Sequence, residues 1–123
     1  MAKQERIYDV PIFIYVLELE NGCYYVGQSI NVVRRLAEHQ AGTGAGWTRR
    51  NRPVRLLEVI FTGLFSSKAA ERLEDWHTIR YMRAKGWAYV RGGCYFGAAQ
   101  RVRHRLQAHA LARPALHIDF SLI

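Results

Sequence analysis

Short runs of apolar residues along the chain predict β-strands. Runs of about four to eight residues rich in β-branched, aliphatic and aromatic side chains are typical of strands. Such runs occupy residues 12–19, 23–27 and 54–61, and a shorter extended stretch occupies residues 87–90. Near the C-terminus, apolar and polar residues alternate, which predicts a terminal strand or a docking tail containing Ile118, Phe120 and Leu122.

Between and after these strands, apolar residues recur at the spacing of amphipathic helices. The predicted helices run from Asn31, as N-cap, to about residue 40, from Ser66 or Ser67 to about residue 84, and from residue 97 to residue 112. The element order predicts an α+β fold with a small, mainly antiparallel, three-stranded central sheet flanked by helices. An extra C-terminal helix, with Val102 and Leu106 facing inward, and an apolar tail follow this core.

The composition adds a strong positive charge to this picture. The 123 residues suit one domain, and a hydrophobic content of 50% is typical of a packed core rather than a disordered chain. The formal net charge is +8, and 15 of the 18 basic residues are Arg. Because guanidinium groups bind phosphates in a bidentate manner, this charge favours nucleic acid as a partner. The alternative is a solvated basic surface or an Arg-biased genome.

The sequence disfavours several classes of protein and site. Its apolar runs are far shorter than the roughly 20 residues that span a bilayer, so we expect no membrane association. The N-terminal sequence MAKQERIYDV lacks the apolar segment of a signal peptide. Cys23 and Cys94 have no C-x-x-C spacing, which disfavours a zinc site. We expect both to be small core residues of a reduced, cytoplasmic protein acting at the nucleoid, with one disulfide as the alternative.

The turn between the first two strands decides whether two tyrosines can cooperate. Directly opposed residues of an antiparallel pair share one face of the sheet. A two-residue loop formed by Asn21 and Gly22 would therefore place Tyr15 and Tyr25 on opposite faces of the hairpin.

We predict instead a three-residue loop, in which a type I turn precedes Gly22 in the left-handed bulge position. Leu19 then pairs with Cys23, and Tyr15 faces Gly27, which leaves open space beside the ring. The two tyrosines become diagonal neighbours on one face, roughly 7–8 Å apart. The alternative for each tyrosine is ordinary strand packing, since Tyr is enriched in strands.

The predicted first helix places two ionisable side chains one above the other. Arg35 and His39 are four residues apart, so they stack along one edge of the inward-facing stripe. That stripe consists of Val33, Leu36, Ala37 and Gln40. A side chain at its edge can be partly buried and still reach a substrate. Taken alone, the pair would be a solvated helix charge and a surface histidine.

The predicted second helix places a carboxylate at a similar border. Its core-facing residues are Ala69, Leu73 and Trp76. Glu74 lies beside this stripe, one turn after Ala70, where a carboxylate can hold one Mg²⁺. Glu71 and Asp75 are expected to pair with Arg or Lys on the helix surface. The same surface pairing is the alternative for Glu74.

The tyrosine-bearing strands resemble the two signatures of the GIY-YIG nuclease superfamily. Ile14-Tyr15 is similar to the end of the first signature, with Phe13 standing where Gly is usual. Tyr25-Val26-Gly27 is similar to the second signature, with nine residues between the two tyrosines. The resemblance covers about residues 12–93, so we expect one domain of residues 1–123 with this nuclease core and an extension at 94–123.

The spacing of the other candidate residues also resembles the family. Arg35 follows Gly27 by eight residues, and His39 follows Arg35 by four. Glu74 follows Ala70 by four residues, as the metal-binding glutamate of the family does. The segments WTRRNRP and VRGG are similar to the approach to the third strand and to the closing run of some members. Many members carry an Asn after the metal-binding helix, whereas no Asn follows Asn51 here.

The resemblance implies a metal-dependent DNA endonuclease that hydrolyses phosphodiester bonds. Glu74 would bind one Mg²⁺ or Mn²⁺ per active site, and either Tyr15 or Tyr25 would orient or deprotonate the attacking water. Arg35 would neutralise charge that grows on the phosphate in the transition state. His39 would hydrogen-bond a tyrosine or transfer a proton. Gly27 would be structural at this site.

Basic and aromatic side chains around the core are the predicted DNA contacts. They are Arg34, Trp47, Thr48, Arg49, Arg50, Arg52, Arg91, Arg101 and Arg105. Phosphate contacts of this kind give affinity without sequence information. Two alternatives stay open: a non-catalytic DNA-binding module of the same fold, and a structure-specific repair or recombination nuclease subunit that needs a protein partner. The apolar tail at residues 118–123 leaves a homodimer open as well.

Overall fold

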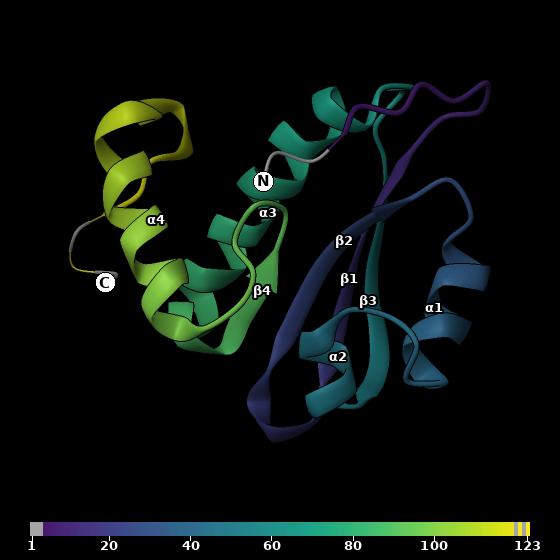
Figure 1. Cartoon of the computed structure of the whole chain (residues 1–123), viewed down its shortest axis with the longest axis horizontal. Helices are drawn as coiled ribbons and strands as arrows, with labels where there is room; N and C mark the ends of the chain where they lie inside the picture. The colour runs from purple at the N-terminus through teal and green to yellow at the C-terminus, as the bar shows by residue number, and fades with distance from the viewer. Residues whose placement is uncertain (1–3, 120, 122) are drawn as a thin grey trace.

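A four-stranded mixed sheet forms the centre of the protein (Figure 1). The structure is a computed structural model, and it describes residues 4–119, 121 and 123. The strands are β1 (Phe13–Leu19), β2 (Tyr24–Ser29), β3 (Pro53–Phe61) and β4 (Val90–Gly92). Their order in the sheet is β3-β1-β2-β4. β1 pairs in antiparallel fashion with β2 and β3, and β4 pairs in parallel with β2.

The prediction of a three-stranded sheet is therefore wrong, although the α+β class is confirmed. The fourth strand, β4, pairs only Val90, Arg91 and Gly92 with residues of β2. Three residues are too few for a hydrophobic alternation to reveal a strand, and a parallel partner far away in the sequence leaves no local turn signal.

The described residues form four α-helices. They are α1 (Val32–Gln40), α2 (Gly46–Arg50), α3 (Ser67–Lys85) and α4 (Ala99–Ala112). Three of them lie near the sheet and α4 packs on α3, and α2 was not predicted. Short 3₁₀ turns occupy Glu20–Gly22, Trp87–Tyr89 and Pro114–Leu116. The predicted N-cap Asn31 is confirmed, because its side chain accepts from the Arg34 N–H. Ser66, one of the two predicted starts of the next helix, caps α3 by accepting from the Ala69 N–H. Within the described part of the chain, no helix is long and apolar enough to cross a membrane.

The two faces of the sheet are covered by different helices (Figure 1). On one face, Tyr15, Leu17 and Leu19 pack with side chains of α1 and α2. On the other face, Ile14, Val16 and Val26 pack with Tyr81 of α3. A third cluster joins α3, β4 and α4, and its buried members are Ile79, Met82, Val90, Tyr95, Val102, Leu106, Leu116 and Ile118. The extension thus packs on α3 rather than on the sheet.

The inward faces of α1 and α3 differ from the predicted stripes. Val33 is 82% exposed on α1, where His39 is buried instead. On α3, Leu73 and Trp76 are 36% and 44% exposed. The buried residues of α3 are Ser67, Ala70, Glu74, Asp75, Thr78, Ile79 and Met82. The predictions failed because they assumed that the apolar residues of a helix face the core. These two helices bury hydrogen-bonded polar groups instead.

The hairpin between β1 and β2 has the predicted register but a different turn. Tyr15 faces Gly27, as predicted, and the Leu19 N–H donates to the Cys23 carbonyl at 2.8 Å. Gly22 has the predicted left-handed conformation, with φ of 69°. The type I turn is wrong, however, because Asn21 is also left-handed, with φ of 63° and ψ of 26°. Asn and Gly tolerate this conformation best, so they form the tight turn while Glu20 is the extra residue.

The C-terminal region is fastened to α3 through Asp75, which was predicted to lie on the surface. Asp75 is 2% exposed, accepts the Cys94 N–H at 2.8 Å and pairs with Arg113 at 2.8 Å. After α4, residues 117–119 form no strand, and Ile118 packs into the α3–α4 cluster. The predicted tail positions Phe120 and Leu122 lie outside the described residues. Cys23 and Cys94 are both free thiols.

Replacing Asp75 tests the fastening of the extension. Asp75→Ala removes the acceptor of the Cys94 N–H and of Arg113, so it should lower the free energy of unfolding by about 2 kcal/mol. Urea unfolding followed by circular dichroism measures this loss. Glu71→Ala on the same helix is the matched control and should change stability by less than about 0.5 kcal/mol. Equal stability of the two variants would contradict the assigned role of Asp75.

Candidate active site

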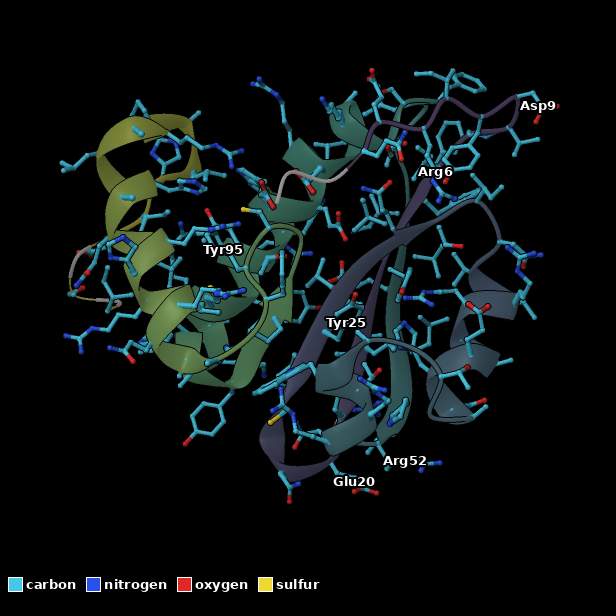
Figure 2. All side chains as sticks on the ribbon, in the orientation of Figure 1. Arg6, Asp9, Glu20, Tyr25, Arg52 and Tyr95 are labelled. Atoms are coloured by element: carbon cyan, nitrogen blue, oxygen red, sulfur yellow. The ribbon has the colours of Figure 1, made fainter. Side chains whose placement is uncertain are left out.

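Tyr15 and Tyr25 lie together on the face of the sheet that α1 covers. Their ring centroids are 6.3 Å apart, with the ring planes tilted by 45°. Gly27 permits this arrangement, because a Cβ there would overlap ring atoms of both tyrosines. Tyr15 is buried, whereas Tyr25 is partly exposed near the middle of the molecule (Figure 2). The hairpin register therefore brings two phenol groups into one small volume.

His39 is a buried member of a hydrogen-bond chain that runs from Tyr15 through Thr48 to the Ala45 carbonyl. The Tyr15 hydroxyl lies 2.8 Å from His39 Nε2, and His39 Nδ1 lies 2.7 Å from Thr48 Oγ1. The Thr48 hydroxyl donates to the Ala45 carbonyl at 2.9 Å. Because its proton is used there, Thr48 accepts from His39 Nδ1–H, and the neutral ring leaves Nε2 as an acceptor. Tyr15 is therefore the donor in its hydrogen bond with His39 Nε2.

The surroundings of His39 keep the ring neutral. Burial, followed by the positive charge of Arg35, lowers the pKa of His39 from 6.5 to about 4. The loop before α2 closes over the ring, since a Cβ on Gly44 would overlap its atoms. The sequence alone indicated neither the wall formed by Gly44 nor the role of Thr48, because both depend on a loop that folds back over α1.

Arg35 provides the positive charge of this site. Its guanidinium lies within hydrogen-bonding reach of the hydroxyls of both Tyr15 and Tyr25. Its Nη1 also donates to the Glu38 carboxylate at 3.1 Å. Burial lowers the pKa of Arg35, but the Tyr15 hydroxyl and the Glu38 carboxylate together raise it above its ordinary value. Arg35 therefore stays charged beside the two phenols.

Both phenols are protonated in the protein as it stands. Burial raises the pKa of Tyr15 far above its ordinary value, and it raises the pKa of Tyr25 to about 12. The negative charge of Glu74 raises both values further, whereas the charge of Arg35 lowers them. A neutral tyrosine at this site can still orient a water molecule through the lone pairs of its oxygen.

Glu74 reaches the tyrosines from α3 past the open end of β4. The parallel ladder ends where Val26 pairs with Gly92, so the rest of β2 has no strand neighbour on that side. Glu74 is 3% exposed, and its Oε1 accepts from Gln28 Nε2 at 3.0 Å. The same Gln28 nitrogen donates to the Ser67 carbonyl at 3.1 Å, which fixes the amide. Gln28 was not among the residues predicted from the sequence.

Of the candidate site residues, Glu74 is the carboxylate that could hold a hard cation with water completing the coordination. Among residues 4–119, 121 and 123, no group of three or more His, Cys, Asp or Glu side chains is arranged to hold a metal ion. Mg²⁺ is commonly bound through one or two carboxylates, waters and substrate phosphate oxygens. A single, oriented carboxylate at Glu74 therefore suits Mg²⁺ or Mn²⁺, whereas a closed zinc site needs about four protein ligands.

Most of the residues predicted to contact DNA are at least partly exposed. Those that are exposed are Arg34, Arg49, Arg50, Arg52 and Arg101, and Trp47 and Arg105 are half-buried. Thr48 is buried against His39, so it positions the histidine instead. Arg91 is 2% exposed, donates to the carbonyls of Gly97 and Trp87, and stacks over the Trp47 ring at 4.4 Å. Its placement fits a structural role rather than a direct DNA contact.

A large cavity opens beside Tyr25 and extends toward α4. Its volume is about 820 Å³, and it runs between α2, α3 and the loop that follows β4. Its lining residues include Trp47, Arg50, Lys68, Arg72, Phe96 and Arg105. The exposed basic residues of α2 and α3 therefore face the same space as one of the two tyrosines.

Two tyrosines, an arginine, a histidine and a buried glutamate thus converge at the open end of a mixed sheet in a small α+β protein. The family model of the GIY-YIG catalytic domain matches residues 11–87 of the chain. The chain belongs to the GIY-YIG family, whose members are generally endonucleases. Its curated relatives are UPF0213 proteins, which are stand-alone members of that family.

These relatives share between a third and a half of the aligned residues with this chain. A UPF0213 protein of Halobacterium salinarum is 39% identical over 72 residues, which cover 58% of this chain and 90% of the relative. One of Natronomonas pharaonis is 40% identical over 73 residues, covering 59% and 82%. One of Streptococcus agalactiae is 44% identical over 59 residues, covering 48% and 64%. No solved structure matches the chain.

The buried neutral His39 makes a prediction about stability and pH. Below pH 6.5 the unfolded chain protonates this residue, whereas the folded protein does so only near pH 4. The free energy of unfolding should therefore fall by up to about 3 kcal/mol as the pH is lowered through this window. Urea unfolding at several pH values measures the slope. His39→Gln should lack this part of the slope, and identical slopes in both proteins would rule out the assignment.

Proposed function

We propose that this protein is a metal-dependent endonuclease that hydrolyses phosphodiester bonds in DNA. The observation that carries the proposal is the arrangement of Tyr15, His39, Arg35 and Glu74. The Tyr15 hydroxyl donates to the neutral His39 ring and lies beside the Arg35 guanidinium. The negative charge of buried Glu74 also acts on this hydroxyl. Membership of the GIY-YIG family supports the same chemistry.

Tyr15 and His39 would handle the proton of the attacking water. Since the Tyr15 hydroxyl donates to His39 Nε2, its oxygen lone pairs can accept a hydrogen bond from water. As the water oxygen bonds to phosphorus, the water proton passes to Tyr15 and the Tyr15 proton passes to His39. This direction of donation suits Tyr15 to the role of proton acceptor, and Tyr25, which is the more exposed of the two, is the alternative. The bond from phosphorus to the 3′-oxygen breaks in the same step, and the leaving 3′-oxygen takes up a proton from solvent. Because its pKa is low, His39 then releases the extra proton through Tyr15 to solvent, which restores the starting state.

Arg35 and Glu74 would manage the charge of the phosphate. The Arg35 guanidinium faces both phenols, where it can neutralise negative charge that builds on the phosphate oxygens. Glu74 would hold Mg²⁺ or Mn²⁺, and Gln28 would keep its carboxylate in place. When bound, such an ion supplies Lewis-acid stabilisation of the phosphate and of the leaving oxygen.

DNA would bind through the basic surface that surrounds the site. The chain carries a net charge of +8, and exposed arginines of α1 and α2 flank the tyrosines. Binding that depends on phosphate contacts should weaken steeply as salt increases. Action in the cytoplasm on nucleoid DNA, a homodimer and a protein partner stay predictions from the sequence.

Nicking of supercoiled plasmid tests the metal ligand. Wild-type protein should nick the plasmid when Mg²⁺ or Mn²⁺ is present and lose this activity in EDTA. Glu74→Gln keeps the shape of the side chain but removes its charge, so the rate should fall at least about 100-fold. Glu71→Gln on the same helix is the matched control and should keep full activity. Equal rates in all three proteins, or binding of DNA without any cleavage by the wild type, would refute the proposal.

The same assay tests the assignment of the two tyrosines. Tyr15→Phe removes the hydroxyl that donates to His39, and the rate should fall by about 100- to 10,000-fold, as for loss of a general base. Tyr24→Phe is the matched control, because Tyr24 lies on the other face of β2 near Tyr81. Retention of activity by Tyr15→Phe, together with its loss in Tyr25→Phe, would transfer the role to Tyr25.

A further inference from the structure

The segment before β1 lies along the start of α3 and outside the family match, which begins at residue 11. The Arg6 N–H donates to Ser67 Oγ at 2.7 Å, and the Ser67 N–H donates back to the Arg6 carbonyl at 2.8 Å. The Tyr8 N–H donates to the Phe65 carbonyl at 2.9 Å. These bonds use only backbone atoms of the segment, so they hold it in place whatever side chain residue 6 carries.

A polar cavity separates this segment from α1 and the end of β2. Its volume is about 450 Å³. The basic residues that line it are Arg6, Arg34 and Arg35, and its other polar lining residues include Gln4, Gln28 and Ser29. Its carboxylate, on Glu38, already pairs with Arg35 at 3.1 Å. The guanidinium groups of Arg6 and Arg34 thus add positive charge that this carboxylate does not neutralise.

Two of these lining residues also belong to the candidate active site. Arg35 acts on the two catalytic phenols, and Gln28 orients Glu74. An anion in the cavity would therefore lie directly beside the phosphate that is cleaved. Along one strand of DNA a phosphate recurs every 3.4 Å or so of helix axis. A strand with its scissile phosphate at Arg35 consequently brings a neighbouring phosphate to this cavity.

We propose that the cavity is a binding subsite for one backbone phosphate of DNA, next to the scissile phosphate, and that Arg6 and Arg34 hold it together. Guanidinium groups suit the ligand because they present paired donors to phosphate oxygens. The subsite rests on the proposed function, since its ligand is the strand that the enzyme cuts. The N-terminal segment, which precedes the part of the chain that matches the GIY-YIG domain, would thus take part in substrate binding.

The test measures DNA binding by fluorescence anisotropy in EDTA, so that cleavage does not interfere. A labelled duplex is titrated at several KCl concentrations with wild-type protein, Arg6→Ala and Arg55→Ala. Arg55 is the matched control, because it is an exposed arginine on β3 that pairs with Glu18, near the end of β1 away from the cavity. Figure 2 shows Arg6 and Arg52 at opposite ends of the strands. Arg55 comes shortly after Arg52 in the sequence.

Arg6→Ala should raise the Kd for DNA about tenfold, as expected for loss of a charged hydrogen bond, and Arg55→Ala should leave it unchanged. The double variant Arg6→Ala/Arg34→Ala tests whether the two arginines bind the same phosphate. It should reduce the slope of the log of the DNA-binding constant against log salt by about 0.9, which is the contribution of one phosphate to binding of duplex DNA. In the cleavage assay, Arg6→Ala should raise KM and leave kcat unchanged.

Three results would overturn the subsite. Equal affinities of Arg6→Ala, Arg55→Ala and wild type would remove Arg6 from it. A slope change of about 1.8 in the double variant would mean that the two arginines bind separate phosphates. Unchanged affinity with a lower kcat would make Arg6 a residue of the chemical step. Failure of the wild-type protein to bind DNA at all would refute the proposed function itself, which separates the two failures.

Discussion

The pairing of Leu19 with Cys23 across the first hairpin determines where every group of the candidate site can lie. A shift of this register by one residue would turn one tyrosine to the far face of the sheet. With the observed register, Tyr15 faces Gly27, and the missing side chain of Gly27 leaves room for the Tyr15 ring. The left-handed conformations of Asn21 and Gly22 hold this register at the turn. A local property of the turn thus fixes the relation between two phenols ten positions apart.

The remaining groups are brought to these phenols by two separate layers. α1 and α2 cover one face of the sheet and provide Arg35, His39 and Thr48. α3 lies against the other face and provides Glu74, whose charge acts on both phenols. β4 ends at Gly92, before the part of β2 that contains Gln28. The short parallel strand therefore does more than extend the sheet. Its early end leaves Gln28 of β2 without a strand partner on that side, and there Gln28 donates a hydrogen bond to the Glu74 carboxylate.

The sequence predicted the parts of this arrangement that depend on local rules. Hairpin register follows from turn length and strand alternation, and helix starts follow from capping residues such as Asn31 and Ser66. Spacing within one helix related Arg35 to His39. The sequence did not reveal Gln28, the role of Thr48 or the burial of Asp75, because each is defined by a partner in a distant segment. Inward stripes inferred from apolar residues failed for α1 and α3, where buried His39, Glu74 and Asp75 are hydrogen-bonded to partners in other segments.

The distribution of the site along the chain has a consequence for the newly made protein. The hairpin, α1 and α2 contribute their groups within the first 48 residues, whereas Glu74 belongs to a helix that ends at Lys85 and is joined to the sheet through β4. A chain emerging from the ribosome would thus expose the tyrosines and the arginine before Glu74 had been added. The order of synthesis delays the assembly of the candidate site until α3 has been made.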